Sequence, residues 1–218
     1  MTERGTFITF EGSDGSGKST QLRMLHERLV AQGYAVMVTA EPGGTAIGAQ
    51  IRRILLDSAN NEICPLTELL LMFASRAQNV EQVIRPAMGR GEIVLCDRFT
   101  DSTLAYQGVG RGLGRAVVIA LDRIACGGLT PDLTLFIDTD LESSLARVQR
   151  RNTRSAGGTN ETRLDDQAIE FHRRVRDAYL QLAVEEPVRF RRIDGNGDAD
   201  VVAARVWETV DGKLQRPL

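Results

Sequence analysis

An eight-residue segment near the start of the chain has the residue types and spacing of a phosphate-binding loop. Residues 12–19 match the pattern G-x-x-x-x-G-K-[ST] at every position. Glycines let such a loop curl so that backbone N–H groups face an anion, at the positive end of the helix that follows. Lys18 can then reach the outer phosphates of a nucleoside triphosphate, and Ser19 can place its hydroxyl on Mg²⁺. The predicted triphosphate-binding residues are Gly12, Ser13, Asp14, Gly15, Ser16, Gly17, Lys18, Ser19 and Thr20, and Lys18 is also predicted to be catalytic.

A second group of candidates follows the apolar segment Ile93–Asp97. An acid at the end of a buried strand can hold Mg²⁺, or one of its waters, close to the hydroxyl of the phosphate loop. Arg98 comes next and could grip a phosphate bidentately. Leu133–Asp138 also ends in an acid and remains the alternative, although Arg98 favours the first segment. We therefore predict that Ser19 and Asp97 bind the metal, and that Arg98 is catalytic.

Two further segments carry candidate ligands for a second substrate. Residues 41–45 read Glu-Pro-Gly-Gly-Thr, which predicts a turn with Thr45 as the N-cap of a following helix. Arg52 lies on this helix and could bind the substrate, and the alternative is a solvated arginine. Phe73 and Arg76 share a helical face, where a ring beside a guanidinium could support a nucleobase; core packing is the alternative for Phe73. Residues 100–108 are rich in hydrogen-bonding side chains, with helix packing as the alternative for Tyr106 and Gln107.

A basic segment stands out against the overall charge. Residues 147–163 hold five arginines and one acid, Glu161, a net charge of +4 in a chain of net charge −2. Arg147, Arg150, Arg151 and Arg154 are spaced to share one helical face. A solvated face is the alternative to a small mobile lid, at about residues 147–164, that places an arginine on the transferring phosphoryl group. The predicted catalytic lid residues are Arg150, Arg151 and Arg154.

Short apolar segments alternate with helical periodicity, which predicts one α/β domain over residues 1–218 with a mostly parallel five-stranded sheet. The composition, with 42% hydrophobic and 26% charged residues, is that of a globular protein without a basic field for nucleic acid. No apolar segment approaches membrane-spanning length, and the three cysteines suggest reduced core thiols, so we expect a cytoplasmic protein. The expected strands are Phe7–Glu11, Ala35–Thr39, Ile93–Asp97, Leu133–Asp138 and Phe190–Asp194, and the expected helices include Pro65–Met88, Arg115–Cys126, Leu141–Arg151, Asp165–Glu185 and Ala199–Leu214.

Five motifs in order resemble those of the thymidylate kinase family. They are FEGSDGSGKST at residues 10–20, EPGGT at 41–45, FASRAQ at 73–78, DRF at 97–99 and STLAYQG at 102–108. The chain lacks the N-K-x-D guanine-binding motif of GTPases. The resemblance, which runs from about Phe7 to Leu182, implies a P-loop nucleoside-monophosphate-kinase fold and transfer of the γ-phosphoryl of ATP to dTMP with Mg²⁺. Another nucleotide or deoxynucleoside kinase, or a non-catalytic ATP-binding module, is the alternative.

The resemblance also assigns roles to individual residues. It places Phe73 under the thymine, Arg76 on the base edge, and Asp14 and Tyr106 beside the deoxyribose. It implies a bacterial-type lid that supplies the arginine missing from the phosphate loop, and a homodimer packed through helices, with no nucleic-acid or membrane partner. Ala40 departs from the family, whose members often have arginine there. The expected substrate-binding residues are Asp14, Glu41, Arg52, Phe73, Arg76, Arg98, Ser102, Thr103, Tyr106 and Gln107.

Overall fold

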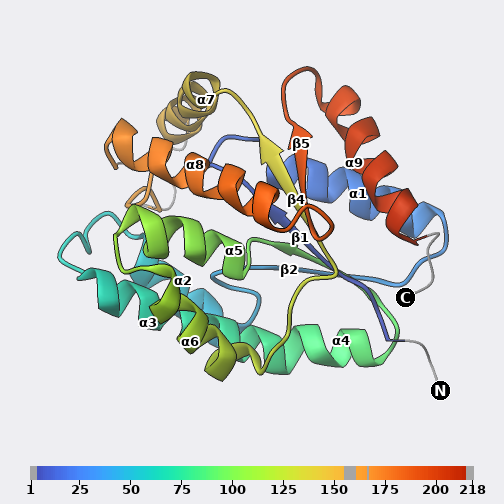
Figure 1. Cartoon of the computed structure of the whole chain (residues 1–218), viewed down its shortest axis with the longest axis horizontal. Helices are drawn as coiled ribbons and strands as arrows, with labels where there is room; N and C mark the ends of the chain where they lie inside the picture. The colour runs from blue at the N-terminus through green and yellow to red at the C-terminus, as the bar shows by residue number, and fades with distance from the viewer. Residues whose placement is uncertain (1–3, 155–160, 166, 215–218) are drawn as a thin grey trace.

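A parallel five-stranded sheet forms the centre of the molecule (Figure 1). The computed structural model describes residues 4–154, 161–165 and 167–214, without the side chains of residues 151–154. The strand order is β2-β3-β1-β4-β5, and all four pairings are parallel. This confirms the predicted sheet, with β2 shifted by one residue. The strands are β1 (Phe7–Glu11), β2 (Val36–Ala40), β3 (Ile93–Asp97), β4 (Leu133–Asp138) and β5 (Phe190–Asp194).

Helices cover both faces of the sheet, so the central strands β1, β3 and β4 are buried between two layers, whereas the edge strands β2 and β5 keep exposed residues. One face packs against α1 (Lys18–Ala31) and α9 (Ala199–Leu214), and the other against the remaining central helices (Figure 1). These others are α2 (Ala46–Leu56), α3 (Pro65–Asn79), the π-helical η1 (Val80–Ile84), α4 (Arg85–Gly89), α5 (Thr100–Thr103), the π-helical η2 (Leu104–Gly110), α6 (Arg115–Cys126) and α8 (Ile169–Glu185), while α7 (Leu141–Arg154) follows β4.

The alternation of side chains along β1 decides which residues reach the functional edge. Ile8 and Phe10 pack into the core beneath α1 and α9, whereas Phe7 packs on the opposite face. Side chains of a strand point to alternate faces, so Glu11 shares the face of Phe7 and Thr9. Because the carboxyl ends of parallel strands meet at one edge, the acid-ended strands and the phosphate loop converge there.

Three predicted helices have different bounds in the structure. The helix expected over Pro65–Met88 contains a π-helical turn at η1, just before Pro86, and ends at Gly89. Proline has no N–H and clashes with the carbonyl four residues earlier, so the wider turn accommodates its ring. α7 continues three residues beyond the predicted end. α8 begins at Ile169 instead of Asp165, because the preceding turn is bonded elsewhere: the Arg163 N–H donates to the Leu56 carbonyl at 3.1 Å.

The cysteines only partly follow the prediction. Cys96 and Cys126 are free and buried, but Cys64 is exposed, so its assignment to the core was wrong. Cys64 is the N-cap residue of α3 and precedes Pro65 at a helix end that faces solvent. No helix in the described ranges is both long and apolar enough to cross a membrane.

Candidate active site

The phosphate loop joins β1 to α1, and its glycines are required by geometry. Gly15 has a φ of 77°, and a Cβ built on it would lie 2.2 Å from the backbone oxygen of Ser144 in α7. A side chain at this position would therefore push α7 away from the loop. Lys18 begins α1, is 7% exposed, and its Nζ lies 3.4 Å from Oδ1 of Asp14. The loop thus places a nearly buried ammonium group beside a helix N-terminus, as an anion site requires.

Ser19, at the start of α1, and Asp97, at the end of β3, are the predicted metal ligands, and their side chains are in contact. The Ser19 hydroxyl donates to Oδ2 of Asp97 at 2.5 Å, and Oδ1 of Asp97 is buried without a hydrogen-bond partner. An unpaired carboxylate oxygen beside a hydroxyl suits Mg²⁺, which binds through one or two protein oxygens plus waters and phosphate oxygens. The described residues contain no group of three acidic, histidine or cysteine side chains placed to hold a metal ion. The Ser19–Asp97 pair therefore fits a magnesium ion that arrives with the nucleotide.

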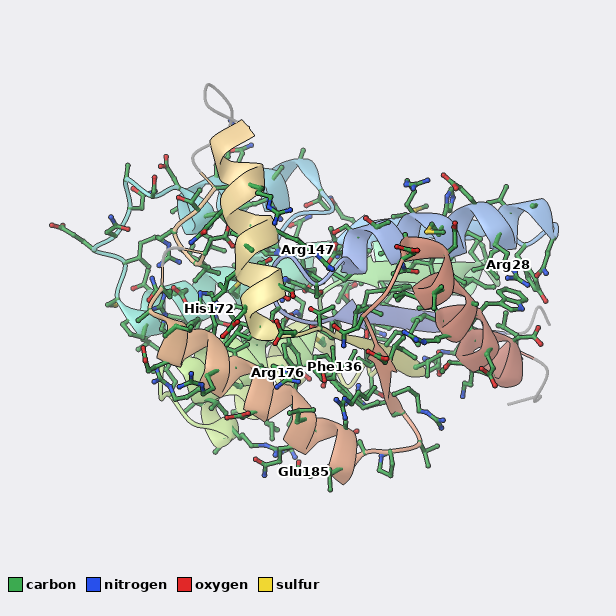
Figure 2. All side chains as sticks on the ribbon, turned by 90° about the horizontal axis from the view of Figure 1, so that it is seen from above. Arg28, Phe136, Arg147, His172, Arg176 and Glu185 are labelled. Carbon is green, nitrogen blue, oxygen red and sulfur yellow. The ribbon has the colours of Figure 1, made fainter. Side chains whose placement is uncertain are left out.

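Asp138, the alternative to Asp97, is occupied by two arginines. Arg176 donates to both of its carboxylate oxygens, at 2.7 and 3.1 Å, and Arg192 donates to Oδ2 at 2.8 Å. Figure 2 shows Arg176 on α8 beside the end of β4. With both oxygens of Asp138 paired and one oxygen of Asp97 unpaired, Asp97 is the better candidate for a metal ligand.

Arg98 is the centre of a hydrogen-bonded cluster at the carboxyl end of β3. Its Nη2 donates to Oδ1 of Asp14 at 2.9 Å and to the Tyr106 hydroxyl at 3.2 Å. Its Nη1 donates to Ser102 at 3.0 Å and to the hydroxyl of Tyr179 at 3.3 Å. The structure thus brings four predicted site residues together: Asp14, Arg98, Ser102 and Tyr106.

The charges of this cluster keep Asp14 ionised. Burial alone would raise the pKa of Asp14, but the positive charges and hydrogen bonds of Arg98 and Lys18 outweigh it and hold that pKa well below its usual range. The phosphate loop therefore carries a fixed negative charge between two cations. Asp14 orients both cations while leaving a positive balance for phosphate groups.

Arg76 and Glu41 form a buried ion pair beside this cluster. Arg76 is 2% exposed, and its Nε donates to Oε2 of Glu41 at 2.5 Å. Its Nη2 donates to Thr103 at 2.9 Å, and its Cζ lies 4.9 Å from the centre of the Phe73 ring. Burial raises the pKa of Glu41 despite the opposing charge of Arg76. The apolar stripe of α3 therefore tolerates Arg76 because its guanidinium meets an anion.

Two other predicted substrate-binding residues make polar contacts outside the cluster. The amide of Gln107, on η2, donates to Oε1 of Glu68 at 2.8 Å. Arg52, on α2, donates to Glu161 at 3.0 and 2.8 Å and to the Pro42 carbonyl at 3.1 Å. Arg52 is therefore not simply solvated, although none of these bonds links it to Arg98.

The predicted lid arginines are described only in part. The side chain of Arg147 extends from α7 towards α1 (Figure 2), and its Nη1 is 3.4 Å from the Gly15 carbonyl oxygen. Arg150 is exposed on α7. The side chains of Arg151 and Arg154 lie outside the described residues, so their predicted roles stay predictions.

Sequence reasoning missed two residues of the cluster, Glu11 and Tyr179. Glu11 accepts hydrogen bonds from the Phe99 N–H at 2.7 Å, the Ser102 hydroxyl at 2.5 Å and the Tyr179 hydroxyl at 2.9 Å. The position of Glu11, an acid ending a buried strand, was a usable signal. Tyr179 carried none, because α8 reaches the site from far along the chain.

The buried carboxyl of Glu11 makes the stability of the fold depend on pH. Burial and the negative charge of Asp101 raise the pKa of Glu11 from 4.5 to about 7, against the opposing effects of Arg98, Ser102 and the Phe99 N–H. Between these two values the folded protein binds more protons than the unfolded chain. Stability from this group is therefore fully present below pH 4.5 and is lost as the pH rises through 7.

A comparison with Glu11→Gln isolates this effect. The unfolding free energy of the wild type minus that of the variant is expected to fall by about 3 kcal/mol from pH 4.5 to pH 8. Urea unfolding at several pH values measures this difference, and the titrating groups that do not interact with Glu11 cancel. A difference that stays constant over this range would show that Glu11 titrates normally in the folded protein.

The chain is similar to known thymidylate kinases in sequence and in fold. The family model described as thymidylate kinase matches residues 10–206. A thymidylate kinase of Pelobacter propionicus is 53% identical over 202 residues, covering 93% of this chain and 92% of that protein. Another, of Geobacter sp. strain M21, is 50% identical over 211 residues, covering 97% and 93%. The crystal structure of thymidylate kinase from Ehrlichia chaffeensis superposes with a TM-score of 0.76 at 30% identity, covering 95% of this chain and 99% of that one. The chain belongs to the thymidylate kinase family.

Proposed function

We propose that this chain transfers the γ-phosphoryl group of ATP to dTMP, giving ADP and dTDP. One observation carries the proposal beyond family membership: Arg98 and Lys18 flank the same carboxylate, that of Asp14. Lys18 belongs to the phosphate loop, whereas Arg98 belongs to the hydrogen-bonded cluster beside the buried Glu41–Arg76 ion pair. A donor phosphate and an acceptor phosphate bound to these two cations would be neighbours.

Phosphoryl transfer depends on positioning and charge stabilisation more than on a covalent catalyst. We assign Lys18 to the β- and γ-phosphates of ATP and Arg98 to the phosphate of dTMP. Asp14, whose Oδ1 contacts both Lys18 and Arg98, would hold the two cations next to each other. Ser19 and Asp97 would hold Mg²⁺, which when bound neutralises charge on the phosphate oxygens. The lid arginines Arg150, Arg151 and Arg154 are proposed to stabilise the transferring group.

The acceptor nucleoside is assigned to the wall formed by α3 and η2. The Phe73 ring would support the thymine, while Arg76, Thr103 and Gln107 would read its polar edge. Tyr106, whose hydroxyl is 3.2 Å from Oδ2 of Asp14, would limit the space at the deoxyribose. Glu41 supports this wall through Arg76, and Arg52 and Ser102 complete the proposed acceptor site.

The remaining proposals concern organisation. We propose a single domain whose basic segment, residues 147–164, closes over the triphosphate, supported by the contact of Arg147 with the loop. We also propose a cytoplasmic homodimer without nucleic-acid or membrane partners. Its interface would use α3 and α6, which pack together and expose Leu66 (51%), Leu70 (48%) and Ile124 (81%).

The direct test of the reaction compares monophosphate acceptors. With ATP and Mg²⁺, dTMP is expected to be phosphorylated at least 10-fold more efficiently than dUMP, since one methyl group in an apolar pocket contributes about 1–3 kcal/mol. Initial rates with dTMP, dUMP, dCMP and AMP give kcat/KM for each. Faster phosphorylation of AMP or dCMP would contradict the proposal.

A further inference from the structure

We propose that Glu11 is a positioning residue that holds Arg98 in the arrangement needed for phosphoryl transfer. Glu11 is 0% exposed and ends β1 directly before the phosphate loop. A substrate cannot reach its carboxyl, so any effect on the reaction passes through its neighbours. The kinetic part of this inference rests on the proposed function, whereas the structural part does not.

The backbone of Arg98 has an unusual conformation that its neighbours must hold in place. Its φ is 70°, in the left-handed region, and it is the one non-glycine residue with a positive φ in the described part of the chain. This conformation is unfavourable for a residue with a side chain and persists only when its surroundings hold it. Two bonds to β1 do so: the Arg98 N–H donates to the Phe10 carbonyl at 2.9 Å, and the Phe99 N–H donates to Oε1 of Glu11 at 2.7 Å. Glu11 therefore supplies one of the two bonds that join the left-handed turn to β1, while the thiol of Cys96 on β3 donates to the Arg98 carbonyl at 3.0 Å.

The side chain of Arg98 is linked to Glu11 through two hydroxyl groups. Oε2 of Glu11 accepts from the hydroxyls of Ser102, at 2.5 Å, and Tyr179, at 2.9 Å. The same two hydroxyl oxygens accept from Nη1 of Arg98, at 3.0 and 3.3 Å. A carboxylate can only accept, so it points both hydroxyl protons at itself and leaves lone pairs for the guanidinium. One buried carboxylate thus bonds groups that hold both the backbone and the Nη1 atom of Arg98, while Asp14 and Tyr106 bond its Nη2 atom.

Glutamine at position 11 would break this order while keeping the shape of the side chain. Its amide oxygen could still accept from the Phe99 N–H, but its NH₂ group would face two hydroxyls as a donor. Those hydroxyls, 2.9 Å apart, could direct one proton to each other, which leaves the second without its acceptor. The second hydroxyl proton would then either stay without an acceptor or turn towards the guanidinium and displace it. We therefore expect Arg98 to lose its fixed position.

The kinetic test uses Glu11→Gln at pH 8. The pKa of Glu11, with Arg98, Asp101 and Tyr179 as the charged and titratable groups around it, is about 7, so the carboxylate form dominates at pH 8. We expect kcat for dTMP phosphorylation to fall about 100-fold, the loss that a misplacement of about 1 Å causes, with KM for ATP within about twofold of the wild type. Asp138→Asn is the matched control, because Asp138 is also a buried acid at a strand end, and its bonds are to Arg176 and Arg192 instead of the groups that hold Arg98. It is expected to lower the melting temperature with little change in kcat.

A double-mutant cycle separates positioning from general weakening of the fold. In an Arg98→Ala background, Glu11→Gln is expected to lower kcat less than about threefold further, because the residue through which it acts is absent. An equal 100-fold loss in both backgrounds would overturn the proposal. So would an unchanged kcat in Glu11→Gln. If Glu11→Gln does not fold, Ser102→Ala combined with Tyr179→Phe removes the same relay without altering the carboxylate, and the same cycle applies.

A crystal structure of Glu11→Gln makes the proposal independent of the substrate. We expect the Arg98 guanidinium to leave Oδ1 of Asp14, whereas an unmoved Arg98 would overturn the inference. Inactivity of the wild type towards dTMP would count against the proposed function alone, since the position of Arg98 in the variant would still decide the role of Glu11.

Discussion

Replacing Lys18 by alanine is expected to lower kcat for transfer from ATP to dTMP by about 1000-fold or more. Lys18 is the only cation of the phosphate loop, and its ammonium is held almost out of water beside the start of α1. Charge that shifts among the phosphate oxygens during transfer would lose its nearest fixed countercharge. The loop backbone would remain, so ATP binding should weaken much less than kcat falls. Steady-state rates with varied ATP measure both quantities.

The chain offers a matched control for this substitution. Its only other lysine is Lys213, near the end of α9 and remote from the loop. Lys213→Ala should retain wild-type kcat, and both variants should unfold at similar denaturant concentrations. Retained transfer in Lys18→Ala would mean that the triphosphate binds elsewhere.

Replacing Arg98 has the second-largest expected effect, and two variants divide its causes. Arg98→Ala removes charge and hydrogen bonds, and kcat/KM for dTMP is expected to fall about 1000-fold. Arg98→Lys keeps the charge but cannot reproduce a planar fork that contacts Asp14, Tyr106 and two further hydroxyls, so a loss of about 100-fold is expected. Rates with varied dTMP at saturating ATP give these values.

Arg115→Ala is the control for a lost guanidinium. Arg115 pairs with Glu185 on the surface, at 2.6 Å, and such exposed pairs contribute about 0–1 kcal/mol to stability. Its kinetics should match the wild type. If Arg98→Lys were fully active, positive charge alone would suffice at this position, and the hydrogen-bonded cluster would have no part in transfer.

The sheet could be predicted because each strand is a short apolar segment bounded by turn signals. Four strands were predicted with their observed bounds, and β2 was displaced by one residue. Helix ends were less predictable where tertiary bonds decide them. Pro86 was visible in the sequence, but only the packing of α4 shows that a π-helical turn accommodates it instead of a helix end.

Candidate site residues at the ends of strands could be predicted from the sequence. Residues that join the site through contacts between distant segments could not. Lys18, Asp97 and Arg98 follow from motifs and from the rule that ligands bind beyond the carboxyl ends of parallel strands. The same rule pointed to Asp138 as an alternative, and only the three-dimensional structure shows that two arginines occupy it. Tyr179 lies 168 positions from Glu11, and no local pattern in either segment predicts their hydrogen bond.

The fate of the γ-phosphoryl group tests the proposed reaction. With γ-labelled ATP, Mg²⁺ and dTMP, we expect the label to appear in dTDP in amounts equal to the ADP formed, and none to be released as inorganic phosphate. Label released to inorganic phosphate, with dTMP recovered unchanged, would contradict a site that joins donor and acceptor phosphates between Lys18 and Arg98.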